Sequence, residues 1–291
     1  INVKLILCLL IYSAIIKWKF FTKRGFLMAK TKAAESKVTA AAKKYMKPSE
    51  VATFGIGLFG VALLTGWMPD YTTTFFADFA FKGKGFDSAS LSHIVEVVFL
   101  IAGFVGAICE LIIGVLVDRT KTKPGKVKPW VGFGAIPLAI ISMLVFVAPN
   151  TTSFGLASVW MIVIYCLYTA VSCAVESPSN CFGALCSPNP AERSSAISIA
   201  SFLRSVGQSG GQVVIIVVGA LMKALMGQQQ FKNAEGQGID LIISTAICAL
   251  GMIIFVMIFF ANNKERVPYT SEKVSLLESI KLVFTNKNLL M

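Results

Sequence analysis

Six long apolar runs, separated by short polar linkers, constrain this chain more than any other feature of its sequence. They cover roughly residues 51–79, 91–117, 130–149, 155–178, 196–222 and 239–261. A membrane-spanning helix needs about 20 mostly apolar residues, so each run is long enough to cross a bilayer. Only 14% of the residues are charged, against about 25% in soluble domains. The sequence therefore predicts an all-α polytopic membrane protein with six transmembrane helices that run as antiparallel neighbours.

The positive charge of the chain, a formal net +12, lies mainly in the linkers between these runs. Basic residues concentrate in 28–50 and 118–129, whereas the alternate linkers carry few. Because cytoplasmic loops retain Lys and Arg, we expect a multi-pass protein of the plasma membrane with both termini in the cytoplasm. A nucleic-acid-binding protein shows its basic residues as a stripe on one folded face, so no nucleic acid is expected as a partner.

The ends of the chain differ from its centre, and four parts are predicted. They are an apolar extension (1–27), a basic cytoplasmic N-terminus (28–50), the six-helix bundle (51–261) and a cytoplasmic linker with an amphipathic helix (262–291). Three interpretations of the extension stay open: translated upstream sequence, a signal anchor or a seventh helix. The chain stops in the apolar residues 289–291, where a further span is expected to start, so we expect it to be truncated.

The residues that commonly carry catalysis or hold metals are scarce. The chain has seven cysteines without a Cys-x-x-Cys pair, and His93 is its one histidine. The cysteines lie in or beside apolar runs, and we therefore interpret them as small buried hydrophobic residues. No enzyme activity, no cofactor and no structural metal are therefore expected.

Ionisable residues inside the apolar runs are the candidate functional residues, because a charge at membrane depth is costly. Glu110 and Glu176 lie within such runs, and Glu176 is close to Pro178. If both face the interior of the bundle, they can share one Na⁺ or H⁺, whose charge offsets their repulsion. Two separate structural roles are the alternative.

The candidate solute-binding residues are Trp67, Asp70 and Arg204. Asp70 follows Pro69, so a helix interruption is expected there, and a solute-facing role and a kink-stabilising role stay open for it. Arg204 is the one Arg well inside an apolar run. It either extends toward the membrane surface or serves as a counter-ion for Glu176 or for a solute.

One linker and a second short motif carry a family resemblance. The linker residues with the characteristic spacing are Asp118, Thr120, Gly125, Lys126, Lys128 and Pro129, and the second motif is Glu192-Arg193. This pattern resembles the glycoside-pentoside-hexuronide:cation symporters, the melibiose-carrier family within the major facilitator superfamily. We interpret it as a cytoplasmic gating motif, in which Asp118 caps or pairs at a helix end while the basic residues hold neighbouring helix ends together.

The resemblance implies the N-terminal, six-helix half of a major facilitator transporter. It further implies an alternating-access symporter for a small polar solute such as a sugar or glycoside, with a cation at Glu110 and Glu176. The missing partner is then a C-terminal six-helix half, without which this chain is not expected to transport. The chain departs from the family pattern where Gly106 replaces an acid, Ala62 replaces another, and Ser201 replaces an Arg. These departures leave sugar specificity and Na⁺ or H⁺ coupling open.

Two other functions stay open on the sequence alone. The first is an uncoupled carrier, or a carrier of a lipid-like or amphipathic solute, which the acids missing at Ala62 and Gly106 favour. The second is a six-helix structural or interaction subunit that does not transport.

Overall fold

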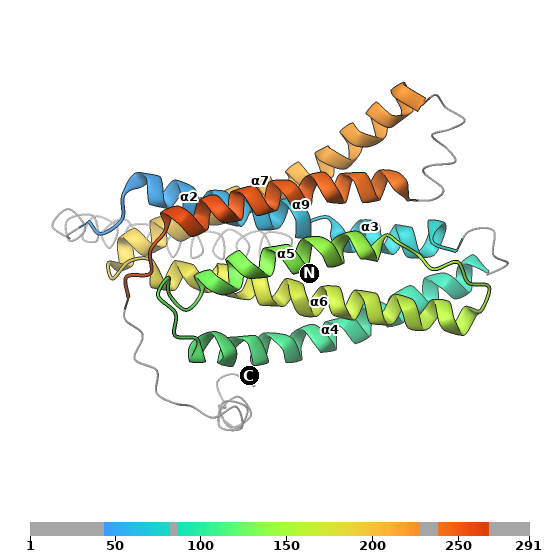
Figure 1. The fold of residues 1–291 in the computed structure, drawn as a ribbon, viewed down its shortest axis with the longest axis horizontal. Coiled ribbons are helices and arrows are strands. Elements are labelled where there is room, and N and C mark those ends of the chain that lie inside the picture. The colour runs from blue at the N-terminus through green and yellow to red at the C-terminus, as the bar shows by residue number, and fades with distance from the viewer. Residues whose placement is uncertain (1–43, 82–86, 227–237, 268–291) are drawn as a thin grey trace, which may run out of the picture. The chain divides into compact units, whose positions relative to one another are not determined.

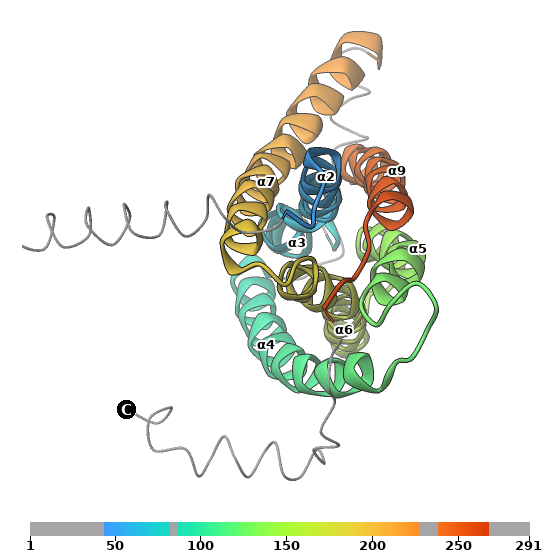
Figure 2. The same cartoon turned by 90° about the vertical axis from the view of Figure 1, so that its left-hand side faces the viewer.

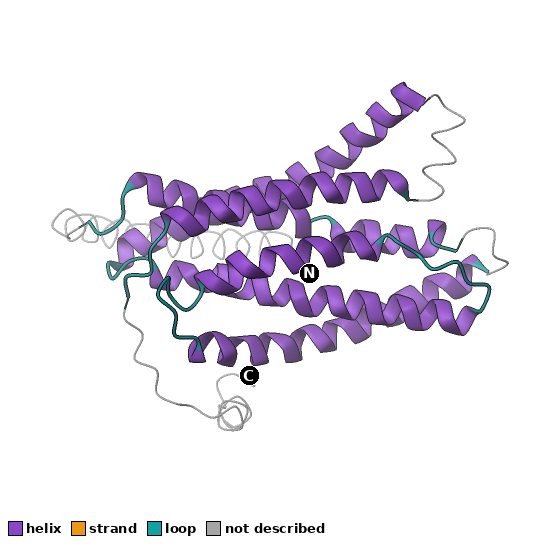
Figure 3. Ribbon diagram, in the orientation of Figure 1, coloured by secondary structure: helices purple, strands orange, loops and turns teal. Residues whose placement is uncertain are grey.

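The computed structural model of the protein describes residues 44–81, 87–226 and 238–267. The chain divides into two compact units, Ile1–Tyr45 and Met46–Met291, and the helices below all belong to the second. Regular structure in the described ranges is helical throughout (Figure 3). The predicted apolar extension at 1–27, the amphipathic helix of the linker and the apolar end at 289–291 all lie outside the described residues.

The helices match the apolar runs of the sequence. They are α2 (Pro48–Thr65), α3 (Met68–Thr74), the π-helix η1 (Phe75–Phe79), α4 (Ser88–Arg119), α5 (Lys128–Val145), α6 (Phe154–Leu185), α7 (Pro190–Met226) and α9 (Ile239–Asn262) (Figure 1). In the part of the chain that the structure describes, six helical segments are long and apolar enough to cross a membrane. The expectation of an all-α polytopic membrane protein is therefore confirmed.

The first span is interrupted where the sequence predicts it. Helix α2 ends at Thr65 and α3 begins at Met68, so Pro69 stands at the start of a new helix, where its missing N–H does no harm. The indole N–H of Trp67 donates to the carbonyl of Leu63 at 3.0 Å and so satisfies one carbonyl next to the break. By contrast, α6 continues through Pro178 to Leu185, beyond the predicted end of its apolar run. Spanning helices tolerate such interior prolines when neighbouring groups satisfy the freed backbone.

Helix α2 lies between α7 and α9 (Figure 2). Helix α5 packs on α6 and α9, and α4 packs on α6. The span that contains α2 is 67% buried inside the protein, whereas those of α4 and α6 are 22% buried. Helices α4 and α6 therefore expose large surfaces, and on α4 these include Leu100 and Phe104, which are 63% and 67% exposed. In a membrane protein such side chains are available to lipid or to a further bundle.

Glycines on α7 allow α2 to approach closely. A Cβ added at Gly207 would lie 2.5 Å from the carbonyl oxygen of Phe59, and one at Gly211 would lie 2.5 Å from that of Leu63. Backbone atoms cannot move aside as a flexible side chain can. Small residues at such crossings are typical of membrane helices, because they let two backbones pack directly.

We expect Gly207→Ala to destabilise the bundle by about 1–3 kcal/mol, the usual cost of overpacking a well-packed contact. Gly219→Ala on the same helix is the matched control, because no atom lies within 4 Å of a Cβ placed there. Since alanine favours helix over glycine by up to about 1 kcal/mol, that variant should be as stable as the parent or more so. Thermal unfolding in detergent compares the two, and equal midpoints would contradict the packing argument.

Candidate functional site

An ion pair at membrane depth joins α6 to α7. The guanidinium of Arg204 donates to Glu176 Oε2 at 3.1 Å and to Asn180 Oδ1 at 2.6 Å. The side chains of Arg204 and Glu176 are 29% and 28% exposed, so the pair is mostly withdrawn from the surface of the bundle. Of the sequence interpretations of Arg204, the counter-ion to Glu176 is the one that the structure shows.

A cleft opens between α4 and α6. Its volume is about 490 Å³, and its lining residues come from α3, α4 and α6: Pro69, Phe99, Ala102, Gly103, Gly106, Ala107, Glu110, Tyr165, Thr169 and Cys173. Glu110 is exposed in this cleft. The sequence singled out Glu110 for its depth in an apolar run, and the structure places it in an open cleft that is lined mostly by apolar residues.

The two acids predicted to share a cation lie on neighbouring helices but have different surroundings. Glu110 lies on α4 and Glu176 on α6, and Cys173 of α6 lines the cleft with Glu110. Glu176 is not a lining residue, and Arg204 occupies one of its oxygens. Residues 44–81, 87–226 and 238–267 contain no group of three or more His, Cys, Asp or Glu side chains that could hold a metal ion. The shared cation stays a prediction.

Asp70 and Trp67 have opposite environments. Asp70 is exposed in the first turn of α3. Trp67 is fully buried, stacked on Phe146 with ring centroids 5.9 Å apart. Asp70 is not a lining residue of the cleft, although its chain neighbour Pro69 is, and Trp67 has a packing role.

At the end of the bundle where α5 begins, one carboxylate holds the α4–α5 loop to the end of α9. Glu265 accepts backbone N–H groups from Lys126, Val127 and Lys128 at 2.8, 2.9 and 3.1 Å. The start of a helix leaves such N–H groups without partners and carries positive dipole charge, so a carboxylate is a favourable partner. Gly125 has φ +121°, and a Cβ there would collide with the same carboxylate, which explains glycine at this motif position.

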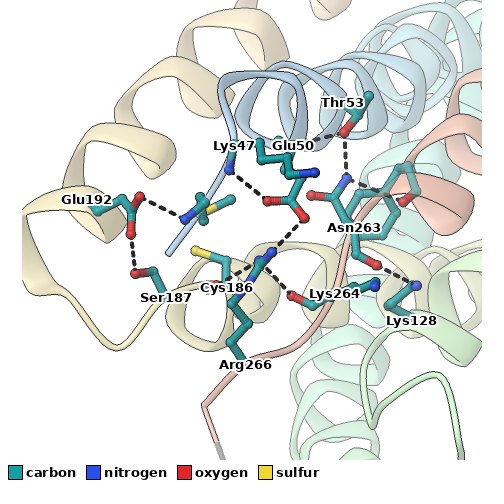
Figure 4. Close-up of polar contacts among 12 residues, drawn as sticks. Lys47, Glu50, Thr53, Lys128, Cys186, Ser187, Glu192, Asn263, Lys264 and Arg266 are labelled. Carbon is teal, nitrogen blue, oxygen red and sulfur yellow. Dashed lines mark hydrogen bonds and ion pairs between the residues drawn. The ribbon is translucent and has the colours of Figure 1, made fainter. Parts of the chain in front are cut away.

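The residues after α9 form a strap across this end of the bundle, residues 263–267 (Figure 4). Arg266 pairs with Glu50 of α2 at 2.6 Å, and its backbone N–H donates to the carbonyl of Leu185 at 2.9 Å. The ammonium of Lys128 donates to the carbonyl of Asn263 at 2.6 Å and lies 4.9 Å from the ring centre of Phe260. The strap thus connects the ends of α2, α5, α6 and α9.

The remaining motif residues have varied environments. Glu192 accepts the backbone N–H of Met46 at 2.9 Å and the hydroxyl of Ser187 at 2.6 Å. Thr120 accepts the indole N–H of Trp130 at 2.9 Å, and Pro129 is the second residue of α5. Asp118 is exposed and makes no hydrogen bond or ion pair with any described residue. The capping or pairing role expected for Asp118 therefore stays a prediction, as does that of Arg193.

Sequence reasoning did not find Glu265, Arg266, Glu50 and Tyr165. Glu265 lies 139 residues from Lys126, and no local pattern links the two. Glu50 offered a weak signal, since an acid in the first turn after Pro48 is typical of a helix start. Tyr165 lies inside an apolar run, where an aromatic residue is expected to belong to the hydrophobic core.

A bundle of six long apolar helices, with an ion pair between two of them and an open cleft, defines a polytopic helical membrane protein. The sequence pattern of the family described as MFS/sugar transport protein matches residues 53–291. The chain therefore belongs to this family of the major facilitator superfamily, as the resemblance implied. Because that family consists of transporters, the expectation that the chain is not an enzyme is also confirmed.

Several curated proteins resemble the chain. It is 27% identical over 194 residues to the inner membrane symporter YicJ of Escherichia coli (strain K12), which covers 66% of this chain and 39% of YicJ. It is 31% identical over 183 residues to the isoprimeverose transporter of Lactiplantibacillus pentosus, covering 63% of this chain and 36% of the relative. An uncharacterized symporter of Bacillus subtilis (strain 168), YjmB, is 28% identical over 266 residues, 90% of this chain and 53% of the relative. The chain thus spans about half or less of the length of these relatives.

Proposed function

We propose that the chain forms part of a cation-coupled sugar transporter of the plasma membrane that works by alternating access. The observation that carries this proposal is that two carboxylates lie on helices that pack together, Glu110 in the open cleft on α4 and Glu176 on α6. Such charges are costly at membrane depth unless they serve a pathway or a partner. Family membership and the names of the isoprimeverose transporter and of the putative glycoside/cation symporter YagG of Escherichia coli (strain K12) support a sugar as the solute.

In the proposed mechanism, the coupling ion is Na⁺ or H⁺ and binds at Glu110 and Glu176. Glu176 now has its charge offset by Arg204, so an arriving cation competes with the guanidinium for the same carboxylate. Displacement of Arg204 would free its N–H donors for a solute hydroxyl. Solute and cation then favour the same state of the protein, which is the thermodynamic requirement for coupling.

The proposal also covers the membrane topology. The end of the bundle with the Lys-rich α4–α5 loop is assigned to the cytoplasm, because cytoplasmic loops retain Lys and Arg. Since the chain matches at most about half of its relatives, we propose that transport needs a further helical bundle. In this arrangement the solute lies near the membrane midplane between two bundles that rock around it.

The test uses the complete protein, with whatever sequence its gene encodes beyond Met291, in membrane vesicles. We expect Glu110→Gln and Glu176→Gln each to lower cation-driven sugar accumulation by about 5- to 150-fold, the usual range of coupling between two sites. Glu96→Gln is the matched control, because the Glu96 side chain is 78% exposed and does not line the cleft. Undiminished cation-driven accumulation in both variants would rule out the proposed ion site.

An uncoupled carrier is the second candidate, and the engagement of Glu176 by Arg204 favours it. If the pair is permanent, Glu176 has no role in cation binding. Sugar uptake that is unaffected by collapse of both the Na⁺ and the proton gradient supports this candidate against the symporter.

A further inference from the structure

Helices α5 and α9 share an outer surface, the α5–α9 face, that is apolar throughout. Every exposed side chain of α5, and every one of α9 over residues 243–261, is apolar. The two helices pack on each other, and the rings of Phe133 and Phe260 lie 6.3 Å apart, centre to centre. The large exposed side chains of the face are Phe133, Ile136, Ile140, Leu144, Ile243, Ile247, Leu250, Ile254 and Met257. A continuous apolar surface of this kind needs lipid or another apolar surface to cover it.

The other side of the bundle has a different character. Figure 2 shows α5 and α9 on one side of the bundle and α4 and α7 on the other. Helix α7 carries Arg204, which pairs with Glu176. It also exposes polar side chains within its membrane part: Ser201, Ser205, Gln208, Ser209 and Gln212. Polar side chains at membrane depth face protein or water rather than lipid. The further bundle of the proposed transporter is therefore expected on the side of α4 and α7, which leaves the α5–α9 face to lipid.

Four exposed cations, the basic cluster, lie at the end of the bundle where α5 begins and α9 ends. Arg119 ends α4, Lys121 and Lys123 belong to the α4–α5 loop, and Lys264 belongs to the strap. Glu265 binds this loop through three backbone N–H groups, so its chain neighbour Lys264 lies beside the loop. None of the four side chains makes a hydrogen bond or ion pair with a residue that the structure describes.

The carboxylates at this end of the bundle leave the basic cluster with a positive excess. Glu265 is engaged by the three N–H groups, and Glu50 is engaged by Arg266. Glu192 accepts from the Ser187 hydroxyl and from a backbone N–H. Asp118 is exposed and is the remaining acid here within residues 44–81, 87–226 and 238–267. Four free cations thus face one free carboxylate, and an anionic group complements them.

We propose that the basic cluster and the α5–α9 face together form a docking surface for an anionic phospholipid such as phosphatidylglycerol. The lipid phosphate lies among Arg119, Lys121, Lys123 and Lys264, and the acyl chains lie along α5 and α9, beginning at Phe133. Basic clusters beside spanning helices attract anionic headgroups, and each cation strengthens binding by about fivefold. This inference rests on the proposed function only for the side assigned to the further bundle.

The first arm of the test measures lipid affinity of the complete protein in detergent by native mass spectrometry. Phosphatidylglycerol and phosphatidylcholine with identical acyl chains are the probes, and we expect phosphatidylglycerol to bind more tightly. Lys121→Gln combined with Lys123→Gln should weaken its binding by about 10- to 30-fold, because two fivefold contributions are lost. Lys223→Gln is the matched control, since Lys223 is an exposed cation in the last turn of α7, at the other end of the bundle. Unchanged thermal midpoints in phosphatidylcholine verify that both variants are folded.

The second arm locates the bound lipid with tryptophans introduced on the α5–α9 face. Phe133→Trp places one near the basic cluster, and Ile243→Trp places one near the other end of α9. Bromine atoms on acyl chains quench tryptophan fluorescence on contact. Brominated phosphatidylglycerol, as a minor component of phosphatidylcholine nanodiscs, should quench the tryptophan at position 133 more than the one at position 243, after subtraction of the parent signal. Brominated phosphatidylcholine should quench both equally.

Inorganic phosphate distinguishes a lipid surface from a site for a small anion. In the first arm it should not displace phosphatidylglycerol at equal concentration, because it lacks the acyl chains that the α5–α9 face binds. Displacement by phosphate would overturn the assignment to lipid.

The remaining outcomes are equally decisive. Weaker binding of phosphatidylglycerol in the double variant, together with stronger quenching at position 133, supports the docking surface. Unchanged affinity in the double variant, or equal quenching by phosphatidylglycerol at both positions, would overturn it. Absence of quenching by either lipid at both positions would show that a protein surface covers the face, which also overturns it. No sugar or coupling ion enters these measurements, so their failure leaves the transporter proposal standing.

Discussion

Replacing Glu265 with alanine is expected to destabilise the bundle by about 2–4 kcal/mol, because the carboxylate accepts three backbone N–H groups at the start of α5. Hydrogen bonds to a charged group are each worth about 1.5–3 kcal/mol, but water can replace part of them at this half-exposed end of the protein. Loss of the carboxylate would also release the α4–α5 loop from the strap. The effect should therefore exceed that of a typical surface substitution.

Thermal unfolding of the detergent-solubilised protein measures this effect, with a midpoint lowered by about 5–15 °C. Glu265→Gln keeps one acceptor oxygen and should therefore lower the midpoint by about half as much as Glu265→Ala. Glu96→Gln removes an exposed carboxylate from the opposite end of α4 and should leave the midpoint unchanged. Gly125→Ala provides an independent check, because the new Cβ would collide with the Glu265 carboxylate. A Glu265→Ala protein as stable as the parent contradicts the role assigned to the strap.

Replacing Arg204 with methionine is expected to lower sugar uptake by about 10- to 100-fold, since Glu176 then stays without its partner at membrane depth. Both side chains are somewhat under a third exposed, so water moderates the cost, and we place the energetic penalty at about 1–3 kcal/mol. The same change removes the donors that the proposed mechanism offers to the solute. Methionine keeps the apolar stem that packs beside α6.

A double-mutant cycle separates pairing from a direct role in transport. If the pair is only structural, Glu176→Gln combined with Arg204→Met should restore stability and uptake together, since no unpaired charge remains. If either residue takes a direct part in transport, Arg204 in solute binding or Glu176 in cation binding, stability returns and uptake does not. Unaltered uptake in Arg204→Met alone would exclude both roles. Initial rates of labelled-sugar uptake and thermal midpoints of the same preparations provide the two readouts.

Much of the fold could be predicted from local sequence. The apolar runs anticipated the spanning helices because every backbone polar group in lipid must be satisfied within the segment, which leaves the helix as the available form. The interruption near Pro69 followed from the missing N–H of proline. The end of α6 could not be predicted, since a proline inside a spanning helix is tolerated or not according to the groups that surround it.

The candidate site could be predicted in part. Glu110 and Glu176 were identified because a carboxylate in an apolar run is unusual, and Arg204 was noted for the same reason. Which of these side chains pair depends on helix rotation and crossing, which leave little trace in a single sequence. Tyr165 has no unusual sequence context, and only its position beside Phe99 in the α4–α6 cleft draws attention to it.

The sequence by itself determined that this protein is a helical membrane protein, how its spans follow one another and which linkers are basic, because those properties depend on hydrophobicity and charge along one segment at a time. The tertiary structure alone decided that Arg204 pairs with Glu176, that Glu265 holds the start of α5 and that an aromatic and a carboxylate share one cleft. These contacts join residues that are far apart in the chain, so they arise only when the helices pack.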